Sequence, residues 1–142
     1  MGSTLLGLIL DSSVLIAAER RKLTPEQTIE SVRKTTGEIP IVLCSLTIAE
    51  IGHGIYRANT PELRDRRRAY LDELKATVPI HPITEATAEI VARIGGEQAS
   101  RGVTLPLGDL IIGACALELG YAVGTSNVRD FARIPDLSVV HL

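Results

Sequence analysis

Four acidic residues, far apart along the chain, are the best candidates for chemistry: Asp11, Glu50, Asp109 and Asp130. Asp11 closes the apolar run Leu5–Leu10. Asp109 is the only charged residue between Thr104 and Leu117. A lone carboxylate is costly to bury, so each of these side chains needs a partner. One divalent cation would serve all four, and the pattern therefore predicts metal-dependent hydrolysis.

The electrostatics of such a cluster favour a hard cation. Two carboxylates about 4 Å apart repel by about 4 kcal/mol at an effective dielectric constant near 20. Protonation relieves part of the repulsion by raising pKa values, and a cation relieves more of it. All-oxygen ligands suit Mg²⁺ or Mn²⁺ rather than zinc. No His/Cys cluster for zinc is expected, because Cys44 and Cys115 lie in apolar sequence and indicate reduced core residues. His81 is expected at the surface or at a strand end.

Asp11 and Glu50 also have structural explanations. Asp11 could cap a helix, but Ser12 and Ser13 already supply capping oxygens. Ligands of an open parallel sheet bind beyond the carboxyl ends of its strands, which favours a functional role for Asp11. For Glu50 the functional and structural explanations are evenly balanced, because Thr47 and Glu50 have the spacing of a capping box.

Asp109 and Asp130 also have structural explanations that compete with a functional role. The helix macrodipole favours an acid in a first turn by about 0.3–1 kcal/mol, which is a structural explanation for Asp109. Its predicted helix lacks a polar face for a merely solvated acid, so the functional role is favoured. Asp130 follows Asn127 at cap spacing, while Thr125, Ser126 and Asn127 could equally orient water or the acids. Both interpretations of Asp130 stay open.

The elements that must position these acids alternate between two patterns. The strand-like runs are Leu6–Leu10, Ile41–Cys44, Val78–His81, Tyr121–Gly124 and Leu137–Val140. The helix-period stretches are Ser13–Ala18, Thr24–Thr36, Leu46–Ala58, Pro61–Thr77, Thr84–Arg101 and Leu107–Leu119, with a short one after Asn127. This alternation predicts an α/β fold, a three-layer α/β/α sandwich with a central, mainly parallel five-stranded sheet. With no repeat or long linker, residues 1–142 are expected to form a single domain.

Composition and missing motifs exclude several functions. The net charge of −2 gives no global attraction to nucleic acid, and 3% aromatic residues leave little for a base-stacking platform. No dinucleotide fingerprint, P-loop or nucleophile elbow is present. Ser13 stands where a haloacid dehalogenase carries its second Asp, which argues against that phosphatase class. The N-terminal apolar run is too short for a signal peptide or a membrane span, so a cytoplasmic protein without membrane association is expected.

Taken together, the four acidic segments resemble the PIN-domain family, and within it the VapC-like toxins of type II toxin–antitoxin systems. The resemblance spans essentially the whole chain and is carried in order by LILDSSVLI, SLTIAEIGHGIYRA, LPLGDLIIGACALELG and VGTSNVRDFARIPDLSVV. It implies a PIN-like fold and a Mg²⁺- or Mn²⁺-dependent endoribonuclease that prefers single-stranded RNA. Asp11 and Asp109 match the metal ligands of the family, Glu50 the third acid and Asp130 the fourth, a role that Asn127 could share.

The resemblance also implies partners. Family members commonly form homodimers, and an antitoxin inhibits the toxins by covering the acidic cleft with its C-terminal segment. Arg57 shares a predicted helix stripe with Glu50 and is a candidate contact for RNA phosphate or for an antitoxin carboxylate. Arginines 64 and 66–68 could grip the RNA substrate, but they are interleaved with acids, and a solvated face is the favoured explanation. Two other functions stay open: a non-catalytic PIN-like module that binds RNA or protein, and a metal-dependent phosphatase.

Overall fold

The computed structural model describes residues 5–142, which form five strands and seven helices. The strands are β1 (Leu8–Leu10), β2 (Ile41–Cys44), β3 (Ile80–His81), β4 (Ala122–Thr125) and β5 (Val139–His141). The helices are α1 (Ser12–Arg20), α2 (Pro25–Thr36), α3 (Ser45–Tyr56), α4 (Pro61–Thr77), α5 (Glu85–Ser100), α6 (Leu107–Leu119) and α7 (Val128–Phe131). The expected domain starts at residue 1, so its first four residues lie outside the described part.

The five strands form one sheet in the order β3-β2-β1-β4-β5, and every neighbouring pair is parallel. β1 is central: Leu8 pairs with Ile41 on one side and with Ala122 on the other. All three residues of β1 are buried, which explains its uninterrupted apolar sequence. The predicted five-stranded parallel sheet is confirmed.

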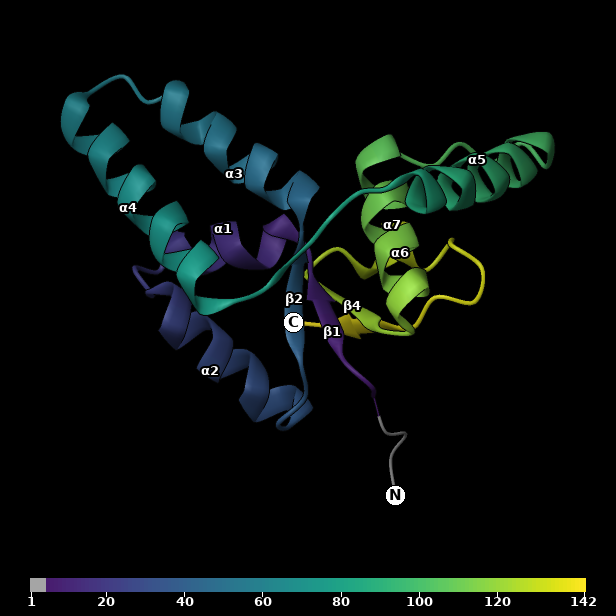
Figure 1. Cartoon of the computed structure of the whole chain (residues 1–142), viewed down its shortest axis with the longest axis horizontal. Helices are drawn as coiled ribbons and strands as arrows, with labels where there is room; N and C mark the ends of the chain where they lie inside the picture. The colour runs from purple at the N-terminus through teal and green to yellow at the C-terminus, as the bar shows by residue number, and fades with distance from the viewer. Residues whose placement is uncertain (1–4) are drawn as a thin grey trace.

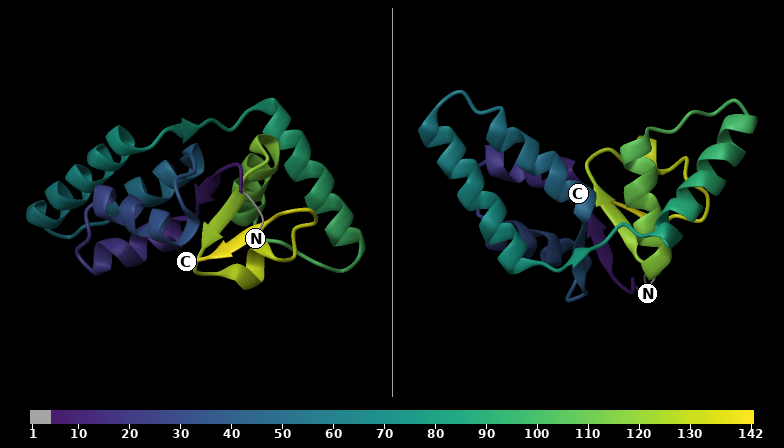
Figure 2. Two further views of the ribbon diagram at one scale, coloured as in Figure 1. Left: turned by 90° about the horizontal axis from the view of Figure 1, so that it is seen from below. Right: turned by 45° about the horizontal axis from the view of Figure 1, so that its top comes forward.

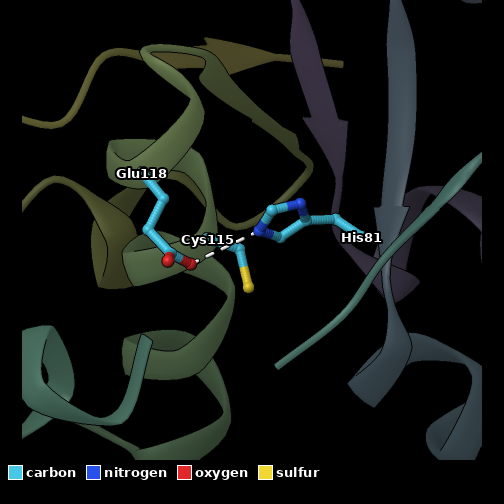
Figure 3. A group of neighbouring side chains, drawn as sticks. All are labelled: His81, Cys115 and Glu118. Carbon is cyan, nitrogen blue, oxygen red and sulfur yellow. Dashed lines mark hydrogen bonds and ion pairs between the residues drawn. The ribbon is translucent and has the colours of Figure 1, made fainter. Parts of the chain in front are cut away.

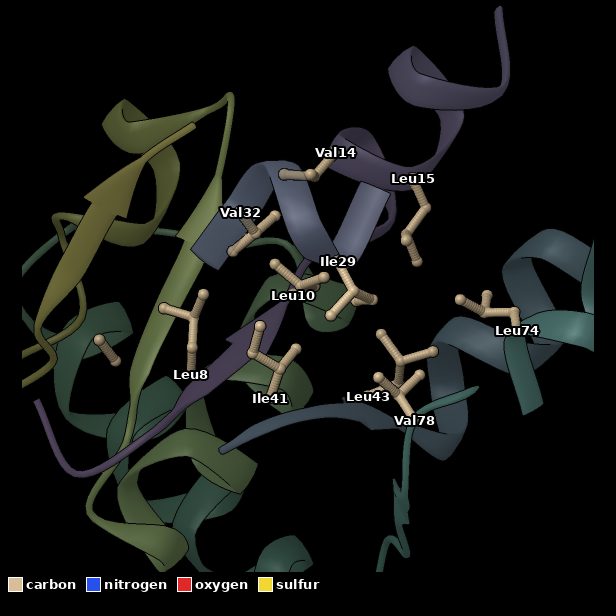
Figure 4. Packing of buried hydrophobic residues seen from close by; sticks show 11 residues of the cluster. Leu8, Leu10, Val14, Leu15, Ile29, Val32, Ile41, Leu43, Leu74 and Val78 are labelled. Carbon is tan, nitrogen blue, oxygen red and sulfur yellow. The ribbon is translucent and has the colours of Figure 1, made fainter. Parts of the chain in front are cut away.

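Side chains of β1 alternate between two cores, one on each face of the sheet. Leu8 and Leu10 point into a cluster with residues of α1, α2 and α4 (Figure 4). Ile9 points the other way, into a cluster with residues of α5, α6 and α7. Figures 1 and 2 show these two groups of helices on opposite sides of the sheet. The predicted three-layer sandwich is therefore confirmed.

Most differences from the predicted elements are at strand ends. Leu6 is 69% exposed and β1 begins only at Leu8. β3 is reduced to two residues, because only Ile80 and His81 pair with β2. Helix starts are closer to prediction, as in α2, which begins one residue after the predicted Thr24 because Thr24 and Gln27 form a capping box there. No helix within residues 5–142 combines the length and the apolar character needed to cross a membrane.

Candidate functional site

Asp11 stands at the carboxyl end of β1, as predicted, and at the N-cap of α1. Its backbone N–H donates to the carbonyl of Gly124 (2.9 Å), which ties it to the end of β4. Ser12 and Ser13 lie inside the helix, so the expectation that they supply the capping oxygens is wrong. The helix starts at Ser12 because β1 leads directly into it. Although Asp11 occupies the cap position, its carboxylate makes no side-chain cap bond and faces the sheet end instead.

Two hydroxyl groups hold the Asp11 carboxylate, which is only 8% exposed. Ser13 Oγ donates to Asp11 Oδ2 at 2.7 Å, and Thr125 Oγ1 donates to the same oxygen at 3.0 Å. Thr125 Oγ1 in turn accepts the Asn127 N–H at 2.9 Å. The exposed Ser126 takes part through its N–H, which donates to Ser13 Oγ at 3.3 Å. Sequence reasoning missed this contact of Ser13, although its position two residues after Asp11 was a local signal.

Glu50 lies on α3, and the capping-box explanation for it is wrong. The helix starts at Ser45 with Cys44 at its N-cap, because it follows β2 without a loop. Thr47 is therefore inside the first turn, where its hydroxyl is buried and has no hydrogen-bond partner among residues 5–142. A Cβ added to Gly108 would lie 3.8 Å from Glu50 Oε2, which places this carboxylate beside the start of α6.

Asp109 occupies the first turn of α6 and lies within electrostatic reach of the other three acids. Burial raises the pKa of its carboxyl to about 6, and repulsion from Asp11, Asp130 and Glu50 adds to that increase. Arg133 acts in the opposite direction and was not foreseen from the sequence. Partial burial, and then repulsion from Asp11, also raise the pKa of Glu50, while the hydroxyl of Ser12 opposes them.

Asp130 lies in α7 and already has two partners. Asn127 Nδ2 donates to Asp130 Oδ2 at 2.7 Å, and the Arg133 guanidinium lies 3.5 Å from Oδ1. Asn127 does occupy the N-cap of α7, but its side chain makes no cap bond and holds Asp130 instead. The structure thus gathers the four acids from four distant segments. Within residues 5–142, however, no three of them bring oxygens within 4.8 Å of one another.

A tighter group of metal-type side chains lies elsewhere. His81, Cys115 and Glu118 each offer a ligand atom within 4.8 Å of the other two (Figure 3). The expectation that no His/Cys cluster exists is therefore wrong, because folding joins β3 to the last turns of α6. His81 does lie at a strand end, as expected, and both cysteines are buried and free.

A cavity of about 390 Å³ adjoins Glu50 and contains Arg57 at the end of α3. Its wall also includes Arg20 and Arg67, so the acidic edge has basic side chains beside it. Three side chains of the arginine-rich run on α4 contact α3 or its C-terminal end: Arg67 Nη1 donates to Gly54 O (2.6 Å), Arg64 Nη2 to Ala58 O (3.3 Å) and Arg68 Nη2 to Tyr56 Oη (2.6 Å). Much of this run therefore fastens α4 to α3.

A parallel sheet covered on both faces by helices, with acidic side chains beyond the carboxyl ends of its strands, defines an α/β protein with an acidic ligand-binding edge. The family model described as "PIN domain" matches residues 8–137 of the sequence, and the chain therefore belongs to the PIN-domain family.

Named relatives agree with this assignment. The chain is 33% identical to "Ribonuclease VapC1" of Rickettsia felis over 135 residues, covering 95% of this chain and 96% of the relative. The structure resembles that of VapBC-5 from Mycobacterium tuberculosis, a member of the VapBC family of toxin–antitoxin systems, at a TM-score of 0.72 and 25% identity, covering 96% and 99% of the two chains. The fold also matches that of VapBC2 from Rickettsia felis, bound to a promoter DNA fragment, at a TM-score of 0.80 and 18% identity, covering 95% and 98%.

Proposed function

We propose that this protein is a metal-dependent endoribonuclease and the toxin of a type II toxin–antitoxin pair, with Asp11, Glu50, Asp109 and Asp130 as its catalytic acids. The observation that carries the proposal is that Asp109, in the first turn of α6 beside Glu50, is partly buried near the other three acids, and burial and then their repulsion raise its pKa to about 6. A bound cation would relieve the repulsion among these carboxylates and stabilise their charged forms. The relative named as a ribonuclease, matched over nearly its whole length, supports RNA as the substrate.

The donor set fits Mg²⁺ or Mn²⁺, because the four acids offer only carboxylate oxygens. Asp11 and Asp109 would hold the ion, and Glu50 and Asp130 would complete its surroundings. A bound ion would supply Lewis-acid polarisation of the scissile phosphate and a lowered pKa for a bound water molecule. This proposal needs no protein nucleophile.

The side chains of the chain have distinct tasks in this proposal. Ser13 and Thr125 fix one oxygen of Asp11, which keeps its carboxylate aimed at the site. Asn127 and Arg133 orient Asp130 in the same way. Arg57, in the cavity beside Glu50, would contact a phosphate of the RNA or a carboxylate of the antitoxin.

The partners follow from the same family assignment. We propose that the chain works as one PIN-like unit in the cytoplasm, forms a homodimer, and is inhibited by a cognate antitoxin. The similarity to a VapBC family member of known structure supports a partner protein of the antitoxin class.

The decisive test is cleavage of a labelled single-stranded RNA by wild type and Asp11→Asn with Mg²⁺ or Mn²⁺. We expect Asp11→Asn to lose about a thousandfold in rate, since metal stabilisation of transition-state charge contributes several kcal/mol. Chelation with EDTA should stop the wild type, and added metal should restore it. Asp72→Asn on α4, an exposed carboxylate-to-amide change, is the matched control and should cleave normally.

Two outcomes would replace the proposal. If Asp11→Asn cleaves as fast as wild type, the acids are not a nuclease site. If the wild type binds RNA without cleaving it and takes up no divalent ion in calorimetry, the protein is a binding module. A nitrophenyl-phosphate assay run in parallel identifies a phosphatase, which would hydrolyse the ester and leave the RNA intact.

A further inference from the structure

A second group of ligand-type side chains lies at the opposite end of α6 from Asp109. Cys115 and Glu118 are three residues apart and so share one face of the helix. His81 reaches them from the end of β3, on the segment that crosses from α4 to α5 (Figure 1). Cys115 follows Asp109 by six residues, or about 9 Å along the helix axis. This group, His81, Cys115 and Glu118, is therefore separate from the acidic site.

The spacing of these side chains suits a small tetrahedral ion. His81 Nε2 lies 3.3 Å from Glu118 Oε1. Ligands of a tetrahedral zinc ion are about 3.3–3.8 Å apart, given bond lengths of about 2.0–2.3 Å. The Cys115 sulfur lies within 4.8 Å of both other ligand atoms, so closing on an ion needs a shift of about an ångström. Figure 3 shows the imidazole and the carboxylate turned toward each other beside the cysteine.

One neighbouring side chain strengthens the arrangement. The buried Thr87 donates through Oγ1 to Glu118 Oε1 at 2.6 Å, the kind of outer contact that orients a metal-binding carboxylate. Cys44 Sγ lies 3.5 Å from Cys115 Sγ, but Cys44 is not among the side chains whose ligand atoms all lie within 4.8 Å of one another, so it neighbours the group without belonging to it. The side chains of His81 and Glu118 keep 22% and 17% of their surface exposed, which gives an ion a way in.

Simpler explanations account for only part of this group. An ion pair explains His81 and Glu118 but gives no role to the sulfur atoms. A disulfide would use Cys44 and Cys115 but neither of the other two side chains. A cation uses the imidazole, the Cys115 thiolate and the carboxylate together, and a mixed set of nitrogen, sulfur and oxygen donors suits zinc-class ions rather than Mg²⁺ or Mn²⁺.

We propose that His81, Cys115 and Glu118 bind a transition-metal ion of the zinc class. Water completes the coordination, and the Cys115 thiol proton leaves to solvent as the ion binds. The ion fastens the segment between α4 and α5 to α6, where the two-residue strand β3 otherwise provides little pairing. This site is structural and does not depend on the proposed ribonuclease activity.

The test is a titration of the reduced full-length chain with Co²⁺, a spectroscopic substitute for Zn²⁺. We expect one equivalent to give a near-ultraviolet sulfur-to-cobalt absorption band and the intense visible bands of a tetrahedral ion, both removed by Zn²⁺. His81→Gln and Cys115→Ser should each weaken binding at least about 10-fold. The matched control His141→Gln on the edge strand β5 should bind normally. Asp109→Asn should also keep the sulfur band, because its site is separate.

The wild-type spectrum decides the proposal even if a variant fails to fold. Cobalt binding without a sulfur band would overturn it, and so would unchanged affinity in both folded variants. A Cys44–Cys115 disulfide, seen as a loss of two hydrogens by mass spectrometry, would also overturn it if the reduced protein still gave no sulfur band.

Discussion

The two ends of α6 carry ligand groups of opposite character. In its first turn, Asp109 faces three other carboxylates, and burial together with their repulsion raises its pKa to about 6. In its last turns, Glu118 lies against His81 at 3.3 Å and accepts a hydrogen bond from Thr87. The first end is a set of hard oxygen donors of like charge. The second is a mixed set in which His81 and Glu118 already bond to each other.

This difference separates two ways of building a metal site. Like charges held together by the fold destabilise the protein without a cation, so the cation relieves a repulsion. A mutually bonded group does not need the ion to be stable, so an ion adds a link between elements. Removing one acid should therefore change stability in opposite directions at the two ends of α6.

The largest effect on stability is expected where the acidic end is held in place, at Thr125. Thr125→Val keeps the shape but removes the donor to Asp11 and leaves the Asn127 N–H without its acceptor. We expect a loss of about 1–3 kcal/mol in the free energy of unfolding. Ribonuclease activity should fall by about 10–100-fold, as for other outer-shell contacts of a metal site. Urea denaturation and RNA cleavage measure the two effects.

The matched control is Thr36→Val at the end of α2, whose hydroxyl only donates to nearby backbone carbonyls. It should change stability by less than about 0.5 kcal/mol and leave cleavage unchanged. If Thr125→Val cleaved RNA at the wild-type rate, the hydroxyl contacts of Asp11 would have no part in positioning it.

Local sequence signals were sufficient for much of the fold. Pro61–Thr77 and Leu107–Leu119 form helices over the predicted residues, because proline, capping threonine and apolar periodicity mark their limits. Strand ends were less predictable, since a strand extends only as far as its neighbours pair with it. β3 is short for that reason: only Leu43 and Cys44 of β2 pair with it.

The acidic site was predictable where topology alone decides position. Asp11 ends the central strand, and a parallel sheet brings that position to the ligand-binding edge. The expected caps at Ser12, Ser13 and Thr47 were wrong because α1 and α3 follow their strands without a loop. The N-cap residues are therefore Asp11 and Cys44. The His81 group was missed because it depends on where the crossing segment lies. The i, i+3 spacing of Cys115 and Glu118 was its only local signal.

A smaller effect, of opposite sign, is expected for Asp109→Asn in EDTA. The pKa of Asp109 rises from 3.8 to about 6 on folding, so the folded state binds more protons than the unfolded chain in that range. The wild-type free energy of unfolding should therefore fall as pH rises from about 4 to 6. Asp109→Asn should remove that decrease and be about 1–2 kcal/mol more stable at pH 7, a value discounted for partial exposure.

Chemical denaturation at several pH values measures this difference, with Asp72→Asn as a surface control that should keep the wild-type pH dependence. Saturating Mg²⁺ or Mn²⁺ should stabilise the wild type more than Asp109→Asn, because the ion relieves the same repulsion. A destabilised Asp109→Asn protein in EDTA would show that repulsion among the acids does not destabilise the metal-free protein.

The smallest effect is expected for Glu118→Gln in metal-free protein. The glutamine oxygen can still accept from Thr87, but the carboxylate that faces His81 is lost. We expect a destabilisation of about 0.5–1 kcal/mol, the range of one partly exposed hydrogen bond, measured under the same conditions as Asp109→Asn. The two amide substitutions on one helix should thus differ in sign. If Glu118→Gln instead stabilised the metal-free protein, both ends of α6 would be under strain, and the His81 group would need a cation as the acids do.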